Sequence, residues 1–146
     1  LWFTLRHYGL EGLRAYVREH VRLAAVFEEL VRADDRFEVV APRTMNLVVF
    51  RLRPRAGPVG RPHAAPEPRA ATDARNRALM DALNASGALF LTHTVLPPVV
   101  ASPGEPTPRP DLAGALVLRM SIGAVHTQER HVRAAWDAIR AAAERL

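Results

Sequence analysis

The segment Leu116-Val-Leu-Arg-Met-Ser-Ile122 alternates between two kinds of side chain, and this alternation sets the layers of the fold. In an extended strand, successive side chains point to opposite sides of the sheet. One side is therefore apolar and predicts a covering layer of helices, while Arg119 lies in the middle of the other side. A guanidinium in that position either faces solvent or, where another domain docks on it, requires an anion. The apolar side would be formed by Leu116, Leu118, Met120 and Ile122.

Three other segments have the composition of short strands, because they are apolar or β-branched and end near proline or glycine. They cover residues 37–40, 46–53 and 88–95, and residues 115–122 form the fourth. Apolar residues at three- and four-residue steps predict three helices. The first covers residues 10–33 and follows a short amphipathic turn or helix that ends at Gly9. The second is capped by Thr72 or Asp73 and ends at Gly87, and the third is capped by Thr127.

This order of elements predicts an α+β fold, with a four-stranded, mostly antiparallel sheet and helices on one face. The length of 146 residues fits one domain, 1–146. Two proline-rich stretches, 55–71 and 97–110, lack periodicity and are expected to be extended loops.

The composition excludes several kinds of site. All 20 basic residues are arginine, and the chain contains neither lysine nor cysteine. Thiolate metal sites, cysteine nucleophiles, phosphate-binding lysines and covalent lysine–cofactor bonds are therefore all excluded within this chain. The net charge of +5 is a weak indication of nucleic-acid binding, because an excess of guanidinium groups with a pKa above about 12 and no lysine raises the isoelectric point by itself.

Three motifs could suggest functional sites, but we interpret them as ordinary surface or structural features. Arg14, Arg18 and Arg22 recur at four-residue steps, but Glu11 and Glu19 can neutralise this helix face. His126 and His131 are five residues apart and diverge around a helix, so they do not have the spacing of zinc ligands. His93, inside an expected strand, is interpreted as a hydrogen-bonded structural histidine.

Several phrases together resemble the C-terminal domain of group II pyridoxal-phosphate-dependent decarboxylases, closest to the aromatic-L-amino-acid (tyrosine, tryptophan, DOPA) branch. The resemblance covers most of the chain in the family's order. The phrases are Leu1-Trp-Phe-Thr-Leu-Arg-His-Tyr-Gly-Leu-Glu-Gly-Leu13, Arg18-Glu-His-Val21, Asp35-Arg-Phe-Glu38, Leu47-Val-Val-Phe-Arg-Leu52, Thr92-His-Thr94, Leu118-Arg-Met-Ser-Ile-Gly123 and Thr127-Gln-Glu-Arg-His-Val132. The two proline-rich stretches look longer than the family's usual connections, which puts loop-borne substrate contacts in doubt.

The resemblance implies a cytoplasmic enzyme, an obligate homodimer that releases CO₂ from an aromatic amino acid. Pyridoxal phosphate would be held by a large domain upstream of this chain, which carries the family's lysine. This segment would complete the active site and the dimer, without membrane or nucleic-acid partners. The resemblance places Arg119 near the substrate carboxylate, and we expect no catalytic, cofactor-binding or metal-binding residue here.

Two other interpretations stay open on the sequence alone. One is a free-standing α+β ligand-binding or regulatory module without catalysis, and the other is a basic RNA-binding domain. Because the sequence starts at Leu1 within an apolar segment, we expect this chain to be a piece of a longer polypeptide.

Overall fold

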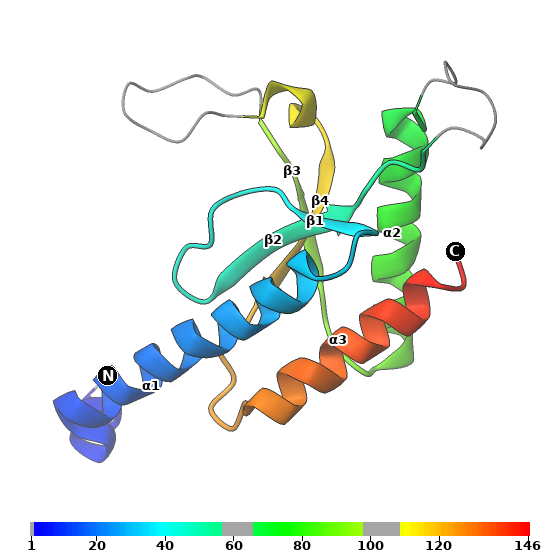
Figure 1. The fold of residues 1–146 in the computed structure, drawn as a ribbon. Coiled ribbons are helices and arrows are strands. Elements are labelled where there is room, and N and C mark those ends of the chain that lie inside the picture. The colour runs from blue at the N-terminus through cyan, green and yellow to red at the C-terminus, as the bar shows by residue number, and fades with distance from the viewer. Residues whose placement is uncertain (1, 57–65, 98–108) are drawn as a thin grey trace.

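The chain forms two layers, a four-stranded sheet and three helices packed on one of its faces (Figure 1). The computed structural model describes residues 2–56, 66–97 and 109–146, so most of both proline-rich stretches lies outside the described residues. The helices are α1 (Trp2–Arg32), α2 (Arg69–Ser86) and α3 (Glu129–Ala143), with a short 3₁₀ turn, η1 (Pro110–Leu112). The strands are β1 (Phe37–Val39), β2 (Leu47–Leu52), β3 (Thr92–Val95) and β4 (Leu116–Ser121).

The sheet has the spatial order β1-β2-β4-β3, and every neighbouring pair is antiparallel. The predicted α+β class and the predicted antiparallel sheet are therefore confirmed. Leu118 in the centre of β4 pairs with Phe50 of β2 and with His93 of β3. The last strand in the sequence thus lies inside the sheet, between strands formed much earlier in the chain.

The core lies between the sheet and the helices, as the alternation in β4 predicts. Leu116, Leu118 and Ile122 are buried there together with apolar side chains from all three helices. At its centre, the Phe27 ring lies 5.8 Å from Trp136 in an edge-to-face arrangement that favours aromatic pairs. One face of each helix therefore supplies the core, in agreement with the periodicity of the sequence.

Helix α1 is interrupted at Gly9, where the sequence predicts a break. Gly9 has φ 64° and ψ 176°, a conformation that is open almost only to glycine. The first turns consequently lie at an angle to the rest of α1 and project from the fold (Figure 1). Trp2 and Phe3 on this projection are 66% and 81% exposed, which leaves an apolar surface uncovered.

Two asparagines of α2 dock this helix on the sheet. The Asn76 side chain accepts the Leu52 N–H at 2.8 Å, and Asn84 accepts the Leu91 N–H at 2.8 Å. The Asn84 amide also donates to the Leu91 carbonyl oxygen at 3.0 Å. The sequence predicts that the third strand begins at residue 88. In the structure it begins at Thr92, because Leu91 is bonded to a helix in this way.

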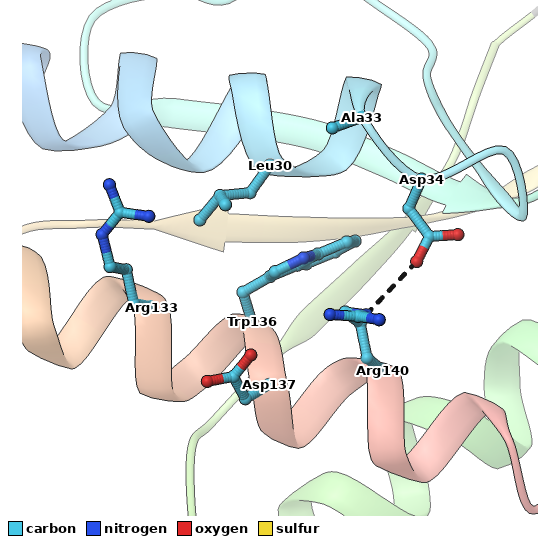
Figure 2. A pocket seen from close by; sticks show the side chains of 7 residues that line it. All are labelled: Leu30, Ala33, Asp34, Arg133, Trp136, Asp137 and Arg140. Atoms are coloured by element: carbon cyan, nitrogen blue, oxygen red, sulfur yellow. Dashed lines mark ion pairs between the residues drawn. The ribbon is translucent and has the colours of Figure 1, made fainter.

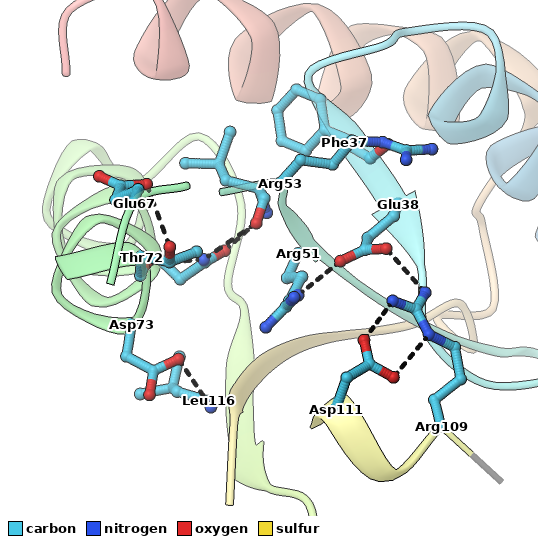
Figure 3. Close-up of polar contacts among 12 residues, drawn as sticks. Phe37, Glu38, Arg51, Arg53, Glu67, Thr72, Asp73, Arg109, Asp111 and Leu116 are labelled. Atoms are coloured by element: carbon cyan, nitrogen blue, oxygen red, sulfur yellow. Dashed lines mark hydrogen bonds and ion pairs between the residues drawn. The ribbon is translucent and has the colours of Figure 1, made fainter. Parts of the chain in front are cut away.

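The predicted helix caps are wrong by up to one turn. Helix α2 begins at Arg69, which also shortens the predicted loop 55–71. The Thr72 hydroxyl donates to the Glu67 carboxylate at 3.0 Å, and Asp73 accepts the Leu116 N–H at 3.1 Å (Figure 3). Thr72 thus bonds to a residue just before the helix, and Asp73 makes a tertiary contact with β4. At α3 the N-cap is Gln128, one residue after the predicted Thr127.

Candidate functional site

Arg119 lies at the middle of β4, on the sheet face opposite the helices. In the strand register it stands beside Val49 of β2 on one side and Thr92 of β3 on the other. Its side chain is half-buried, and its neighbours on this face are an apolar group and a small hydroxyl group. The structure therefore places Arg119 as the alternation predicts, on a rigid central strand of a face without helices.

The strand register places a buried ion pair on the same face, one row further along the strands. Figure 3 shows its residues. The Arg51 Nε lies 2.7 Å from Glu38 Oε1, and both side chains are more than nine-tenths buried. Arg109, just before η1, reaches the other Glu38 oxygen at 2.8 Å and also binds Asp111 at 2.6 Å. This ion network, Arg51–Glu38–Arg109–Asp111, was not predicted from the sequence, because it depends on the register of β1 on β2.

The ion network holds its carboxylates in the charged state. Burial by itself raises the pKa of Glu38, but hydrogen bonds from Arg109 and Arg51 outweigh it and lower the pKa below the usual value. The hydrogen bond from Arg109 likewise lowers the pKa of Asp111. Arg51 and Arg109 are therefore neutralised by fixed negative partners on this face.

Arg119 differs from these two arginines in its electrostatic surroundings. In the described part of the chain, neither Glu38 nor Asp111 forms an ion pair with it. A half-buried guanidinium with planar N–H donors is well suited to bind a carboxylate in a two-point contact. Within the described residues Arg119 forms no ion pair, so the sheet face opposite the helices offers its guanidinium, held by the sheet, as a candidate anion site.

The other motifs weighed in the sequence are not gathered at this face. Arg14 pairs with Glu11 at 2.6 Å and Arg22 pairs with Glu19 at 2.8 Å, as expected for a solvated helix face. His93 is exposed on the edge strand β3, and no hydrogen bond of its ring within the described residues supports its interpretation as a hydrogen-bonded structural histidine. The remaining pair, His126 and His131, is separated by the start of α3. Across residues 2–56, 66–97 and 109–146, no three histidine or acidic side chains are grouped as metal ligands.

A groove of about 340 Å³ lies on the helical side, between the end of α1 and α3 (Figure 2). Both of its arginines are already paired, since Arg140 lies 3.5 Å from Asp34 and Arg133 lies 2.7 Å from Glu129. Trp136 at its base is only 4% exposed because its ring belongs to the core. Since Arg119 has no ion pair in the part of the chain that the structure describes, it is a better candidate than this groove for binding an anion.

The fold and the sequence place the chain in a known class of enzymes. Residues 1–53 match the family model described as the pyridoxal-dependent decarboxylase conserved domain. The chain belongs to this family. None of the helices in the described segments is long and apolar enough to cross a lipid bilayer.

Individual relatives give the extent of the similarity. Tyrosine decarboxylase 2 of Narcissus pseudonarcissus is 41% identical over 136 residues, which cover 93% of this chain and 22% of the relative. Phenylacetaldehyde synthase of Arabidopsis thaliana is 40% identical over 146 residues, 100% of this chain and 24% of the relative. The crystal structure of Oryza sativa TDC with PLP and tryptamine superposes with a TM-score of 0.77 at 38% identity, over 99% of this chain and 26% of that one. The chain thus spans about a quarter of the length of these relatives.

The cofactor of this family is pyridoxal phosphate, and the residues of this chain do not fit its covalent attachment. Attachment requires a side-chain primary amine, and the chain has no lysine. On the sheet face opposite the helices, the side chain of Arg119 is a guanidinium, which does not act as an amine nucleophile. The family match favours the decarboxylase interpretation over the free-standing module and the RNA-binding domain.

Proposed function

We propose that this chain is the C-terminal small domain of a decarboxylase that releases CO₂ from an aromatic L-amino acid. The similarity to tyrosine and tryptophan decarboxylases over nearly the whole chain supports this proposal. The complete enzyme would be a cytoplasmic homodimer whose upstream domain holds the cofactor. The cofactor supplies the electron sink that such a reaction needs.

The role proposed for Arg119 is to hold the substrate carboxylate in place. The observation that carries it is the guanidinium on the central strand β4, which has no ion pair within the described residues and lies on the sheet face opposite the helices. A planar, two-point contact fixes both the position and the rotation of a carboxylate. Rotation matters because the bond to the leaving carboxylate must be aligned with the electron sink before it breaks.

Physical chemistry limits this role to placement. The ion pair with the carboxylate is lost as neutral CO₂ departs, so tighter ground-state binding alone would slow the reaction. Arg119 therefore contributes by orienting the substrate, and the ion network beside it keeps Arg51 and Arg109 from competing for the carboxylate.

The test is Arg119→Met in the full-length enzyme that contains this chain. We expect kcat/KM to fall by about tenfold or more, with a higher KM, while the dimer and the cofactor absorbance are preserved. Arg77→Met, on the exposed surface of α2, is the matched control and should keep normal kinetics. If Arg119→Met instead loses its cofactor or its dimer, while the remaining active molecules keep normal kinetics, the residue is structural.

The product distinguishes simple decarboxylation from aldehyde synthesis, which is relevant because one relative is named phenylacetaldehyde synthase. A decarboxylase releases one amine for each CO₂. Detection of an aldehyde in place of the amine would assign the complete protein to the second reaction.

A further inference from the structure

Thr92 is the direct neighbour of Arg119 on β3, the edge strand beside β4 (Figure 1). Residues that pair directly across two antiparallel strands point to the same face, with their Cβ atoms about 4.5–5.5 Å apart. The Thr92 hydroxyl therefore lies beside the base of the Arg119 side chain, on the sheet face opposite the helices. The residue is exposed, so a ligand can approach it from this face.

The other neighbours of Arg119 on this face are less suited to bind an anion. Val49, across on β2, and Val117, two positions earlier on β4, are both apolar. Ser121, two positions later, carries a hydroxyl, but alternate residues of a strand are about 7 Å apart. Among the strand neighbours of Arg119 that the structure describes, Thr92 is therefore the nearest with a hydrogen-bonding side chain.

The Thr92 hydroxyl has the capacity to bind a ligand. Within residues 2–56, 66–97 and 109–146, none of the side-chain hydrogen bonds of the fold uses it. Thr72, in contrast, already donates its hydroxyl to the Glu67 carboxylate at 3.0 Å. A threonine hydroxyl has one O–H to donate, and a carboxylate is an acceptor of such a bond.

The Arg119 side chain is held close enough to the sheet to share a ligand with this hydroxyl. Arg119 is half-buried, although the helices lie on the other face. Because an arginine that extends straight out from a sheet is exposed, its stem must lie along the sheet surface. A carboxylate has about four lone-pair positions, and the two-point contact of a guanidinium fills only part of them. One carboxylate can therefore bind both side chains.

We propose that Thr92 is a second residue that binds the substrate carboxylate, to which it donates its hydroxyl while Arg119 holds the same group. This inference rests on the proposed role of Arg119 and extends it. A planar two-point contact leaves the carboxylate able to tilt about the axis through its two oxygens. A third hydrogen bond, from a different strand, opposes this tilt and so fixes the direction of the bond that breaks.

The test is Thr92→Val in the full-length enzyme that contains this chain, with L-tyrosine and L-tryptophan as the substrates assayed. Valine has nearly the shape of threonine and also favours strands, so the substitution removes chiefly the hydroxyl. We expect KM to rise by about tenfold, as the loss of one hydrogen bond to a charged group predicts. Thr92→Ser keeps the hydroxyl and should retain most of the affinity. Thr94→Val is the matched control, on the same face of β3 but beside the buried Val117, and should be normal.

A second measurement separates carboxylate binding from a general defect of the site. Tyramine and tryptamine, the amines that correspond to the two substrates, lack the carboxylate, so their inhibition constants should be unchanged in Thr92→Val. The double variant Arg119→Met/Thr92→Val should lose less than the product of the two single effects, because both residues bind the same group. Thr92→Ala, which also lacks the hydroxyl, should agree with Thr92→Val.

The outcomes distinguish this inference from the proposed function. If both Thr92 variants without a hydroxyl keep a normal KM while Arg119→Met is impaired, the inference is refuted and the role of Arg119 stands. If they weaken binding of the amines as much as that of the amino acids, Thr92 only supports the structure of the site, and the inference is again refuted. If Arg119→Met itself has normal kinetics, the proposed role of Arg119 fails and the inference fails with it.

Discussion

Glu38→Gln should destabilise the chain strongly, because it removes the negative charge from the buried end of the ion network. The side chains of Glu38 and Arg51 are 7% and 6% exposed, so the substitution leaves the Arg51 guanidinium buried without a counter-charge. Removing one partner of a buried pair costs about 3–5 kcal/mol. The bond to Arg109, whose side chain is 45% exposed, adds about 1 kcal/mol at most. We therefore expect the free energy of unfolding to fall by about 3–6 kcal/mol.

Urea unfolding of the chain, followed by circular dichroism, measures this loss as a lower midpoint. Asp111→Asn is the matched control, since it removes the other partner of Arg109 at a side chain that is 57% exposed, and it should cost less than about 1 kcal/mol. The double variant Glu38→Leu/Arg51→Met removes both buried charges and should recover most of the stability. A Glu38→Gln variant within about 1 kcal/mol of wild type would refute the reasoning.

Three other outcomes follow from the structure. Because the pKa of Glu38 is lowered on folding, its ionised carboxylate stabilises the fold at neutral pH, and this stabilisation should be lost as the pH falls below about 4. The urea midpoint should therefore be lower at pH 3 than at pH 7. Gly114→Ala should lower the free energy of unfolding by about 1–3 kcal/mol, because φ is 76° and the new Cβ would lie 3.1 Å from the Arg69 guanidinium; unchanged thermal unfolding would contradict this. Replacing the exposed Trp2 and Phe3 with serine should reduce self-association of the isolated chain, measured by sedimentation. A wild-type chain that is already monomeric would contradict the expectation that this apolar surface drives association.

The sequence predicts those features that depend on local pattern. The alternation in residues 116–122 places Leu118 in the core and Arg119 on the opposite face, and both positions are confirmed. The breaks at Gly9 and Gly87 are also confirmed, because each glycine adopts a positive φ that other residues rarely accept. Such features require knowledge only of nearby residues in the chain.

Features that depend on distant partners were not predicted. Asp73 is a residue type typical of a helix cap, but its carboxylate accepts the N–H of Leu116, 43 positions away, and the helix begins about one turn earlier. The ion pair of Glu38 with Arg51 requires the register of two strands, and the contact with Arg109 brings together residues that are 71 positions apart. The position of Arg119 is thus established from local pattern, and its role in binding substrate stays a proposal.

The place of β4 in the sheet also constrains when the fold can form during synthesis. Strand β4 is the last strand to leave the ribosome, yet it supplies the neighbour of β3 and joins β3 to β2. The contact between Asn46 and Ile122 closes a loop of 76 positions, a separation that slows folding relative to local contacts. Until residue 121 is available, β1 and β2 can form only a hairpin beside α1, and β3 has no strand to pair with. A chain that terminates before β4 would therefore lose the centre of the sheet as a whole, and such products should be removed by cellular proteases.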